Sequence, residues 1–235
     1  MEKKNDLIGP VQVSTITCTL YTNIEHIFIE KIPIPFPDES CKVSEKKTKF
    51  KNCIIFKVSF NSESEKDRNI AFNIFRNGIF NVTGVRSIEE AHLVLKYIYE
   101  QFVSLSVIVP VDELVISHKI RMIVSTFSIN KDFILEQLKE LIENKIKDTL
   151  IKYNTDNHPG LIVKFPVESD NKYITFIFFG SGKVIVTGAN NFDSLYKKYN
   201  DVSLFIKENE ESFTLEKQIQ IKIAGKRGRK RKIIE

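Results

Sequence analysis

The sequence predicts an α+β fold in which one structural unit occurs twice. The main observation is internal repetition: FNIFRNGIFNVTG at 72–84 matches FIFFGSGKVIVTG at 176–188 at six of 13 positions. Two shorter blocks repeat in the same order: 54–58 with 161–165 at an offset of 107, and 13–16 with 124–127 at an offset of 111. Each copy also mixes alternating, strand-like segments with segments of helical periodicity. Three ordered blocks indicate a duplication, with longer internal loops in the first copy.

Strands open each copy and form its middle. Alternating apolar residues predict opening strands at 11–20 and 120–129 and further strands at 53–60 and 160–166. A hairpin follows in each copy, across Asn77-Gly78 in the first and Ser181-Gly182 in the second. Glycine suits these turns because a two-residue hairpin loop requires a positive φ.

Helices follow the opening strand and close each copy. The pattern predicts a short helix at 22–31 and a long one at 131–148. A closing helix begins after each Thr-Gly pair, where Ser87 with Glu90 forms a capping box and Asn191 is the corresponding cap. Three prolines predict a loop at 32–49, and the polar stretch 61–69 predicts an exposed loop.

Composition excludes several classes of protein. The 235 residues are 42% hydrophobic and 28% charged, which are proportions of a globular chain rather than a disordered or fibrous one. No apolar run approaches the roughly 18 residues of a membrane span, and no apolar leader follows the first residues. Three cysteines without a C-x-x-C pair argue against a disulfide framework or a structural zinc site. We therefore expect a soluble, intracellular protein with no metal and no cofactor.

The positive charge is concentrated at one end of the chain. The net charge is +5, yet residues 1–224 contain 29 Lys and Arg against 29 Asp and Glu. The segment 225–235 supplies the excess through six cations: Lys226, Arg227, Arg229, Lys230, Arg231 and Lys232. Such a run is typical of a nucleic-acid contact or a nuclear address, and its alternative interpretation is a solvated terminus that aids solubility.

The two faces of the opening strands differ in composition. Ile16, Cys18 and Leu20 share one face of the first strand, whereas small Val and Thr residues occupy the other. The second copy repeats this pattern with Ile123 and Phe127. A solvated sheet face usually carries charged residues, so the small, neutral face indicates a broad, flat partner. The alternative is a second buried face inside a sandwich.

Several motifs resemble the TATA-box-binding protein family over residues 11–203. They are Pro159-Gly160-Leu161-Ile162, Phe179 with Ser181-Gly182-Lys183, Thr187-Gly188-Ala189, and the paired Val-Ser-Thr strands. The resemblance implies a ten-stranded saddle, a curved antiparallel sheet with helices on its convex face. It also implies a concave face that kinks the DNA minor groove with phenylalanine wedges, which is the known behaviour of this family. Four parts are expected: an extension at 1–10, a first repeat with a linker at 11–119, a second repeat at 120–208, and a C-terminal extension with the basic tail at 209–235.

The resemblance implies three sets of DNA-binding residues. The wedges are Phe75 and Phe179, each just before a hairpin turn. The phosphate contacts are Lys57, Lys164 and Lys183. The groove-facing residues are Val13, Thr15, Thr83, Val124, Thr126, Ile185 and Thr187. For the two phenylalanines, ordinary core packing is the alternative interpretation.

The sequence departs from the family at other functional positions. The two asparagines that face the central base pairs are matched to Val11 and Met122, which cannot donate hydrogen bonds to groove acceptors. His158 stands at a further wedge position of the second copy; its counterpart is Lys51, or Phe50 if one residue is inserted. Asn81 replaces a groove valine, and Ile79 replaces a basic residue. The tail segment Arg227-Gly228-Arg229 resembles the centre of an AT-hook, without its flanking prolines.

These residues predict a transcription initiation factor that binds and bends A·T-rich double-stranded DNA. The expected partners are a B-type initiation factor and RNA polymerase, with no membrane and no small-molecule substrate. The alternative is a saddle-shaped protein-interaction platform with weak or no sequence-specific DNA binding. The divergence and the Ile, Lys and Asn bias resemble members encoded by large DNA viruses, which would place the protein in the nucleus, a cytoplasmic viral factory or the virion.

An enzyme is the rival class, and the sequence lacks its usual signatures. His26, His92, His118 and His158 show no metal-ligand spacing. There is no nucleophile elbow, P-loop or dinucleotide fingerprint, and Cys53 lies in a predicted strand without a positioned histidine. We therefore expect a protein that is not an enzyme.

Overall fold

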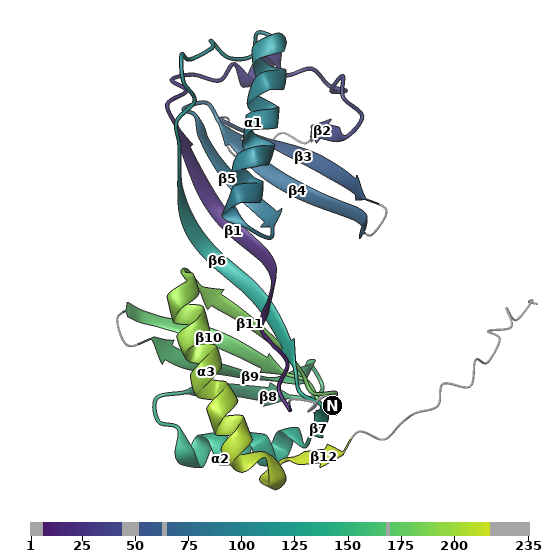
Figure 1. The fold of residues 1–235 in the computed structure, drawn as a ribbon, viewed down its shortest axis with the longest axis vertical. Helices are drawn as coiled ribbons and strands as arrows, with labels where there is room; N and C mark the ends of the chain where they lie inside the picture. The colour runs from purple at the N-terminus through teal and green to yellow at the C-terminus, as the bar shows by residue number, and fades with distance from the viewer. Residues whose placement is uncertain (1–6, 44–51, 63–64, 168–169, 217–235) are drawn as a thin grey trace, which may run out of the picture.

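One antiparallel sheet of ten strands forms the centre of the molecule (Figure 1). The computed structural model describes residues 7–43, 52–62, 65–167 and 170–216. The sheet order is β2-β3-β4-β5-β1-β6-β11-β10-β9-β8. In the first half the strands are β1 (Gln12–Thr22), β2 (Cys41–Val43), β3 (Cys53–Ser62), β4 (Glu65–Phe75) and β5 (Ile79–Val85). In the second half they are β6 (Ile116–Ser128), β8 (Leu150–Asn154), β9 (His158–Val167), β10 (Asp170–Phe178) and β11 (Lys183–Ala189).

The strand order reads the same from both ends, as a duplication requires. β1 and β6 pair with each other at the middle, so they alone join the two halves of the sheet. In Figure 1 these two long strands cross the narrow waist between the lobes. The expected single, curved antiparallel sheet is therefore confirmed, and a sandwich that buries the Val and Thr face is excluded for the described residues.

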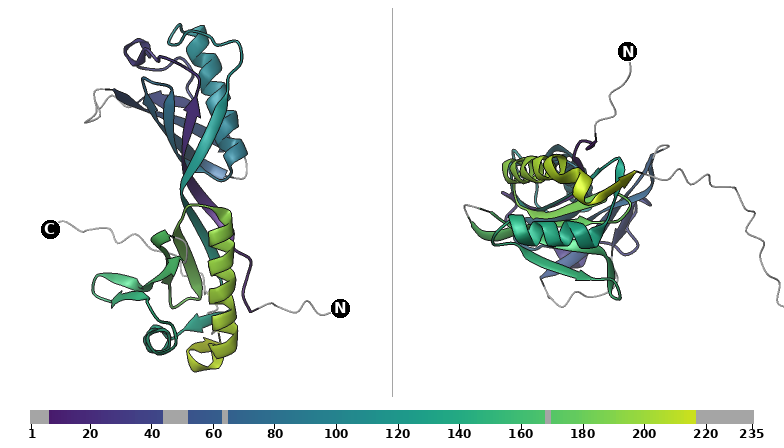
Figure 2. Two further views of the ribbon diagram at one scale, coloured as in Figure 1. Left: turned by 90° about the vertical axis from the view of Figure 1, so that its left-hand side faces the viewer. Right: turned by 90° about the horizontal axis from the view of Figure 1, so that it is seen from below.

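Helices cover one face of the sheet. The closing helices α1 (Ile88–Ser104) and α3 (Phe192–Asn209) lie on the same side of the sheet in Figure 2, one over each half. Both begin at the expected caps, since Ser87 Oγ accepts from the N–H of Glu90 and Asn191 Oδ1 from that of Ser194. Helix α2 (Leu135–Lys145) packs at the end of the second half against β8 and β9. No helix among the described residues is long and apolar enough to cross a membrane.

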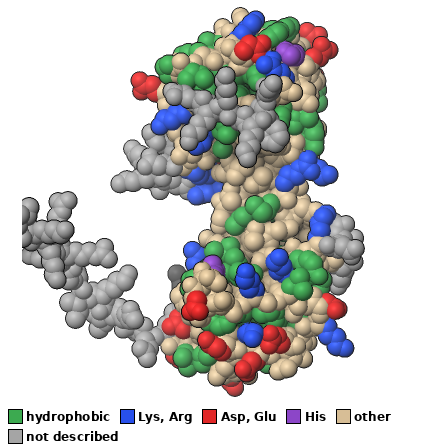
Figure 3. Space-filling view, turned by 180° about the vertical axis from the view of Figure 1, so that it is seen from behind, with side chains coloured by type: hydrophobic (Ala, Val, Ile, Leu, Met, Phe, Trp, Pro, Cys, Tyr) green, Lys and Arg blue, Asp and Glu red, His purple; other side chains and the backbone are tan. Residues whose placement is uncertain are grey.

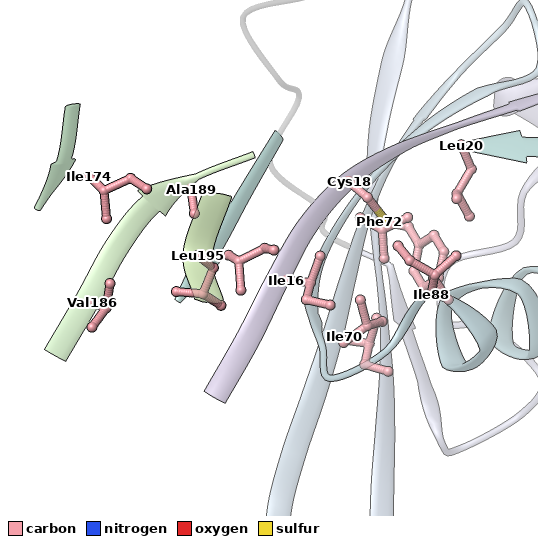
Figure 4. Packing of buried hydrophobic residues seen from close by; sticks show 14 of the residues in the cluster. Ile16, Cys18, Leu20, Ile70, Phe72, Ile88, Ile174, Val186, Ala189 and Leu195 are labelled. Carbon is pink, nitrogen blue, oxygen red and sulfur yellow. The ribbon is translucent and has the colours of Figure 1, made fainter. Parts of the chain in front are cut away.

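The hydrophobic core lies between the sheet and these helices. Inward-facing side chains from both halves join one continuous buried cluster, part of which is drawn in Figure 4. In β1 the buried apolar members are Ile16, Cys18 and Leu20, as the alternation predicts, and Thr19 on the other face is also buried. Since the core occupies only the helix side, the opposite face of the sheet is available to a ligand.

Several predicted elements differ in the structure. The helix expected at 22–31 is absent except for a single 3-10 turn, η1 (Ile29–Lys31). There the N–H groups of Ile27 and Phe28 donate to the carbonyls of Arg76 and Val107, so tertiary pairing holds the chain extended. The helix expected at 131–148 is α2 alone, and it is preceded by β7 (Lys131–Phe133), which pairs with β12 (Thr214–Glu216).

The two predicted loops are partly strand. The proline-rich stretch 32–49 contains β2, which pairs with the neighbouring edge of β3. The polar stretch 61–69 largely continues the β3–β4 hairpin, because Ser59 and Phe60 pair with Asn69 and Arg68. The polar composition of 61–69 indicated solvent exposure, and for that reason the sequence predicted a loop where the structure has strand.

Candidate nucleic-acid interface

The face of the sheet opposite the helices is concave and carries mostly small side chains. Strand alternation places these residues between buried ones: Val124, for example, lies between Ile123 and Ser125, which are completely buried. Figure 3 shows this side of the molecule, where acidic side chains gather toward the far ends and Lys and Arg side chains lie at the borders of the waist. We call the surface the concave face.

The centre of the concave face has an approximate two-fold symmetry. Ile16 pairs with Ile123, and on either side Thr15 pairs with Val124 and Thr17 with Met122. The two-fold axis that exchanges β1 and β6 therefore relates Thr15 to Met122 and Thr17 to Val124. The offset between equivalent residues is 107 in both cases. The same offset relates β3 to β9, whereas β4 and β5 correspond to β10 and β11 at an offset of 104.

The strand pairing corrects the alignment of the opening strands. The block 124–127 corresponds to residues 17–20, and not to 13–16 as the offset of 111 implied. A shift of four residues preserves strand alternation, so the hydrophobic pattern alone cannot detect it. The counterpart of Met122 is consequently Thr15, and the assignment of Val11 to that position was wrong.

A β-bulge also moves one expected groove residue to the other face. Val13 pairs with the buried Ser125 and packs against the core, because Ser14 is an extra residue between the pairs of Val13 and Thr15. Directly paired side chains share a face, so Val13 faces the helices. The prediction that Val13 faces the groove was therefore wrong. The remaining groove candidates lie on the concave face: Thr15, Thr83, Val124, Thr126, Ile185 and Thr187.

Two equivalent rows of residues cross the concave face. The row of the first half follows successive strand pairs and consists of Lys57, Ala71, Thr83, Thr17 and Met122. The row of the second half consists of Lys164, Thr175, Thr187, Val124 and Thr15. Each row thus runs from a lysine at one side to uncharged side chains at the waist, which are Thr17 and Met122 in one row and Val124 and Thr15 in the other. The arrangement combines a flat, neutral floor with cations at its borders.

The border cations are exposed and available to an anionic partner. Lys57, Lys164 and Lys183 are all exposed, and Lys42 lies beside Lys57 on β2. Within the described part of the chain, Lys57, Lys164 and Lys183 form no ion pair with a carboxylate. Lys42 was missed in the sequence because its segment was predicted to be a loop.

The two phenylalanines stand outside the core. Phe75 and Phe179 are half-buried, and neither belongs to the buried cluster or to the side chains packed against it. Each immediately precedes a hairpin turn, where its carbonyl accepts the N–H of Gly78 at 3.2 Å or Gly182 at 2.9 Å. Neither ring therefore contributes to the buried cluster, and their role as wedges stays a prediction. The His158 ring lies 5.9 Å from the Phe179 ring, so this corner carries two adjacent aromatic rings.

A substitution at the second turn tests how the hairpin positions Phe179. Gly182 has φ +79°, and an added Cβ would lie 2.2 Å from the Lys131 carbonyl oxygen. Because the backbone is both left-handed and in close contact there, we expect Gly182→Ala to lower the free energy of unfolding by about 2–4 kcal/mol. Urea unfolding measures the loss, with Gly180→Ala as the control because its added Cβ meets nothing closer than 3.8 Å. Equal stability of both variants would contradict the expectation.

The polar residues on the concave face of the first half were only partly recognised in the sequence. Arg121 is the extra residue of a bulge between the pairs of Thr17 and Cys18, and its Nε donates to Thr19 Oγ1 at 2.9 Å. Thr19 Oγ1 in turn donates to Asn81 Oδ1 at 2.8 Å. Asn73 lies beside Asn81 on β4. Neither the bulge nor the pairing could be read from the chain, although alternation alone places Asn73 and Asn81 on this face.

The described residues do not assemble a metal site. They contain no group of three or more His, Cys, Asp and Glu side chains that could hold a metal ion. Burial raises the pKa of the Cys18 and Cys41 thiols to about 11 and raises that of Cys53, which opposes thiolate formation. The basic tail, including Arg227-Gly228-Arg229, lies outside the described residues, as do Lys51 and Phe50.

Comparison with known proteins decides the family. The family model described as "Transcription factor TFIID (or TATA-binding protein, TBP)" matches residues 117–208, the second repeat. The TATA-box-binding protein of Methanococcus maripaludis strain C6 is 30% identical over 146 residues, covering 60% of this chain and 71% of the relative. The chain belongs to the TATA-box-binding protein family. The Methanococcus vannielii protein is 29% identical over 145 residues, covering 62% of this chain and 72% of the relative.

A solved structure supports the saddle-shaped fold of this TATA-box-binding protein family member. The Methanococcus jannaschii TBP superposes with a TM-score of 0.60 over 84% of this chain and 98% of its own, at 21% identity. The match includes the first half, which the family model does not. The family's description as a transcription factor agrees with the expectation of a protein that is not an enzyme.

Proposed function

We propose that the chain is a transcription initiation factor that binds and bends A·T-rich duplex DNA through the minor groove. The observation that carries this proposal is the concave face itself, with its neutral floor of Val and Thr and an exposed lysine at the border of each half. Small side chains allow a wide groove surface to approach closely, and the lysines lie where phosphates flank it. We assign Lys57, Lys164 and Lys183 to phosphate contacts, and Phe75 and Phe179 to base-step wedges.

Recruitment of other proteins is the second part of the proposal. Helices α1 and α3 face away from the concave surface and carry exposed apolar side chains, among them Leu93 at 67% and Leu204 at 57% exposure. Apolar side chains on a convex surface fit protein partners, so we assign this side to a B-type initiation factor and RNA polymerase. A viral origin, with action in the nucleus or a cytoplasmic factory, is the setting we propose.

A steric block on the concave face tests the proposal. Val124 lies at the centre of the floor and Leu93 on the opposite, helical side. We expect Val124→Trp to weaken binding to a pre-bent A·T-rich duplex at least tenfold, because the bulky ring holds the groove away from the sheet. Leu93→Trp is the matched control and leaves binding intact. Fluorescence anisotropy with a G·C duplex as competitor measures both.

The same titration separates DNA binding from the platform alternative. If the wild-type protein binds the A·T-rich duplex no better than the G·C duplex, sequence-specific binding by the concave face is ruled out. The protein would then act as a protein-interaction platform. Equal binding by the Val124→Trp variant and the wild type would place the DNA elsewhere on the molecule.

A further inference from the structure

The two halves of the concave face differ chemically along one row. In the second half, paired positions on β9, β10 and β11 carry Ile162, Ile177 and Ile185. The equivalent pairs on β3, β4 and β5 carry Ile55, Asn73 and Asn81. Two of the three positions that carry isoleucine in the second half therefore carry asparagine in the first half. We call Asn73 and Asn81 the amide pair.

A hydrogen-bonded network orients the amide of Asn81. Its Oδ1 accepts from Thr19 Oγ1 at 2.8 Å, and Thr19 is almost completely buried at 3% exposure. Thr19 accepts from Arg121 Nε, whose guanidinium also donates to the Tyr21 hydroxyl at 3.1 Å. This network engages one of the two lone pairs of Asn81 Oδ1 and leaves its Nδ2 donors at the other side of the amide group. The neighbouring Asn73 is exposed and offers both a donor and an acceptor.

Among the described residues, no such network is found at the symmetric position of the second half. Arg121 is the bulge residue of β6, and the bulge residue of β1 at the equivalent place is Ser14. Thr126 takes the place of Thr19 and pairs with Ile185 instead of an asparagine. Within the described part of the chain, the polar cluster therefore lies in the first half, and the second half presents three isoleucines.

Minor-groove chemistry turns this difference into a difference in base preference. Every base pair presents acceptors in the minor groove, and a G·C pair adds the N2 amino group of guanine as a donor. An isoleucine pressed onto that amino group would bury it without a partner, which is unfavourable. An asparagine can accept from the amino group and donate to the neighbouring acceptors.

We infer that the first half accepts a G·C pair under the amide pair, whereas the second half requires A·T pairs at the equivalent place. This inference rests on the proposed binding of DNA by the concave face. It gives the recognised element two chemically different ends. A promoter with G·C at one end would therefore be bound in a single direction.

Four duplexes test the inference through orientation. A symmetric A·T duplex allows both orientations, and further duplexes carry one G·C pair in the left half, in the right half, or in both. We expect either single G·C pair to reduce affinity less than threefold, because the protein turns so that its amide pair meets the guanine. The double replacement should reduce affinity roughly tenfold or more. Inosine in place of guanine removes the N2 amino group and should restore the affinity for the doubly replaced duplex.

Two variants locate the effect in the named residues. For each variant, the measured quantity is the ratio of its affinity for the A·T duplex to its affinity for a duplex with one G·C pair. We expect this ratio to be at least ten for the Asn73→Val/Asn81→Val variant. Asn144→Val on the exposed side of α2 is the matched control and should keep the wild-type ratio. The reverse change, Ile177→Asn/Ile185→Asn, should allow the protein to bind the duplex with G·C pairs in both halves without the tenfold loss of affinity.

The outcomes separate this inference from the proposed function. If the wild type binds the A·T duplex but loses as much affinity with one G·C pair as the amide-pair variant, the inference is wrong and DNA binding stands. Insensitivity of every variant to G·C pairs would also overturn it. If no duplex binds, the proposed function itself fails, and the amide pair would then belong to a protein contact.

Discussion

The Phe75→Ala/Phe179→Ala variant should bind A·T-rich DNA without bending it. Separating one base step costs a few kcal/mol, which an inserted ring offsets and a methyl group does not. With both rings removed, we expect the change in end-to-end fluorescence transfer on binding to disappear. Affinity for a pre-bent duplex should fall less than affinity for a straight one, because the pre-bent duplex already carries much of the deformation.

The structure supplies a control for the folding of this variant. Both rings lie outside the core, so we expect the thermal midpoint to stay near that of the wild type. Phe176 lies on β10, the strand that leads into the hairpin turn after Phe179. Phe176→Ala removes a fully buried ring and should lower the free energy of unfolding by about 3–5 kcal/mol. A double variant that unfolds as readily as Phe176→Ala would show that the wedge residues support the fold. Retained bending would assign the kinks to other side chains.

Deleting residues 225–235 should have the second large effect, on the salt dependence of binding. The body is neutral by count and the tail holds six cations, so much of the electrostatic attraction resides there. If all six met phosphates, the slope of log K against log[salt] would flatten by about 5, at roughly 0.9 for each contact. We expect about half of that, because ordering a chain segment for each contact costs conformational entropy.

The deletion also distinguishes charge from base recognition. Phosphate contacts carry no sequence information, so affinity should fall for every duplex while the A·T preference remains. The matched control replaces Lys57 and Lys164 by glutamine in the full-length chain and should flatten the slope by a smaller amount. If the truncated protein keeps its full slope, the concave-face lysines are the main contacts. If the truncated protein loses the A·T preference, Arg227-Gly228-Arg229 is the segment that recognises A·T base pairs.

The duplication and the fold class were predictable because they depend on local patterns that occur twice. The paired Thr-Gly sequences, the turn glycines and the Ser87 cap each follow from short-range chemistry. The missing helix at 22–31 could not be foreseen, because the partners that hold Ile27 extended lie at Arg76 and Ile108, far along the chain.

The candidate site was predictable only where strand alternation is unbroken. Thr83, Thr187 and Ile185 follow from alternation within short, regular strands. Val13 and Arg121 do not, because each lies beside or within a bulge, and a bulge reverses the face of every residue beyond it. Bulges arise from pairing between β1 and β6, which are about one hundred residues apart, so no local pattern marks them.

The central position of β1 has a consequence for biosynthesis. When the ribosome has released residues up to the end of α1, the sheet of the first half ends at β1, whose second edge has no partner until β6 is made. An eleven-residue open edge is a template for pairing with another chain. β1 and β6 are symmetric equivalents, so two nascent chains can join through their β1 strands in nearly the native geometry. We therefore expect translation speed between α1 and β6 to set how long each new molecule is exposed to this misassembly.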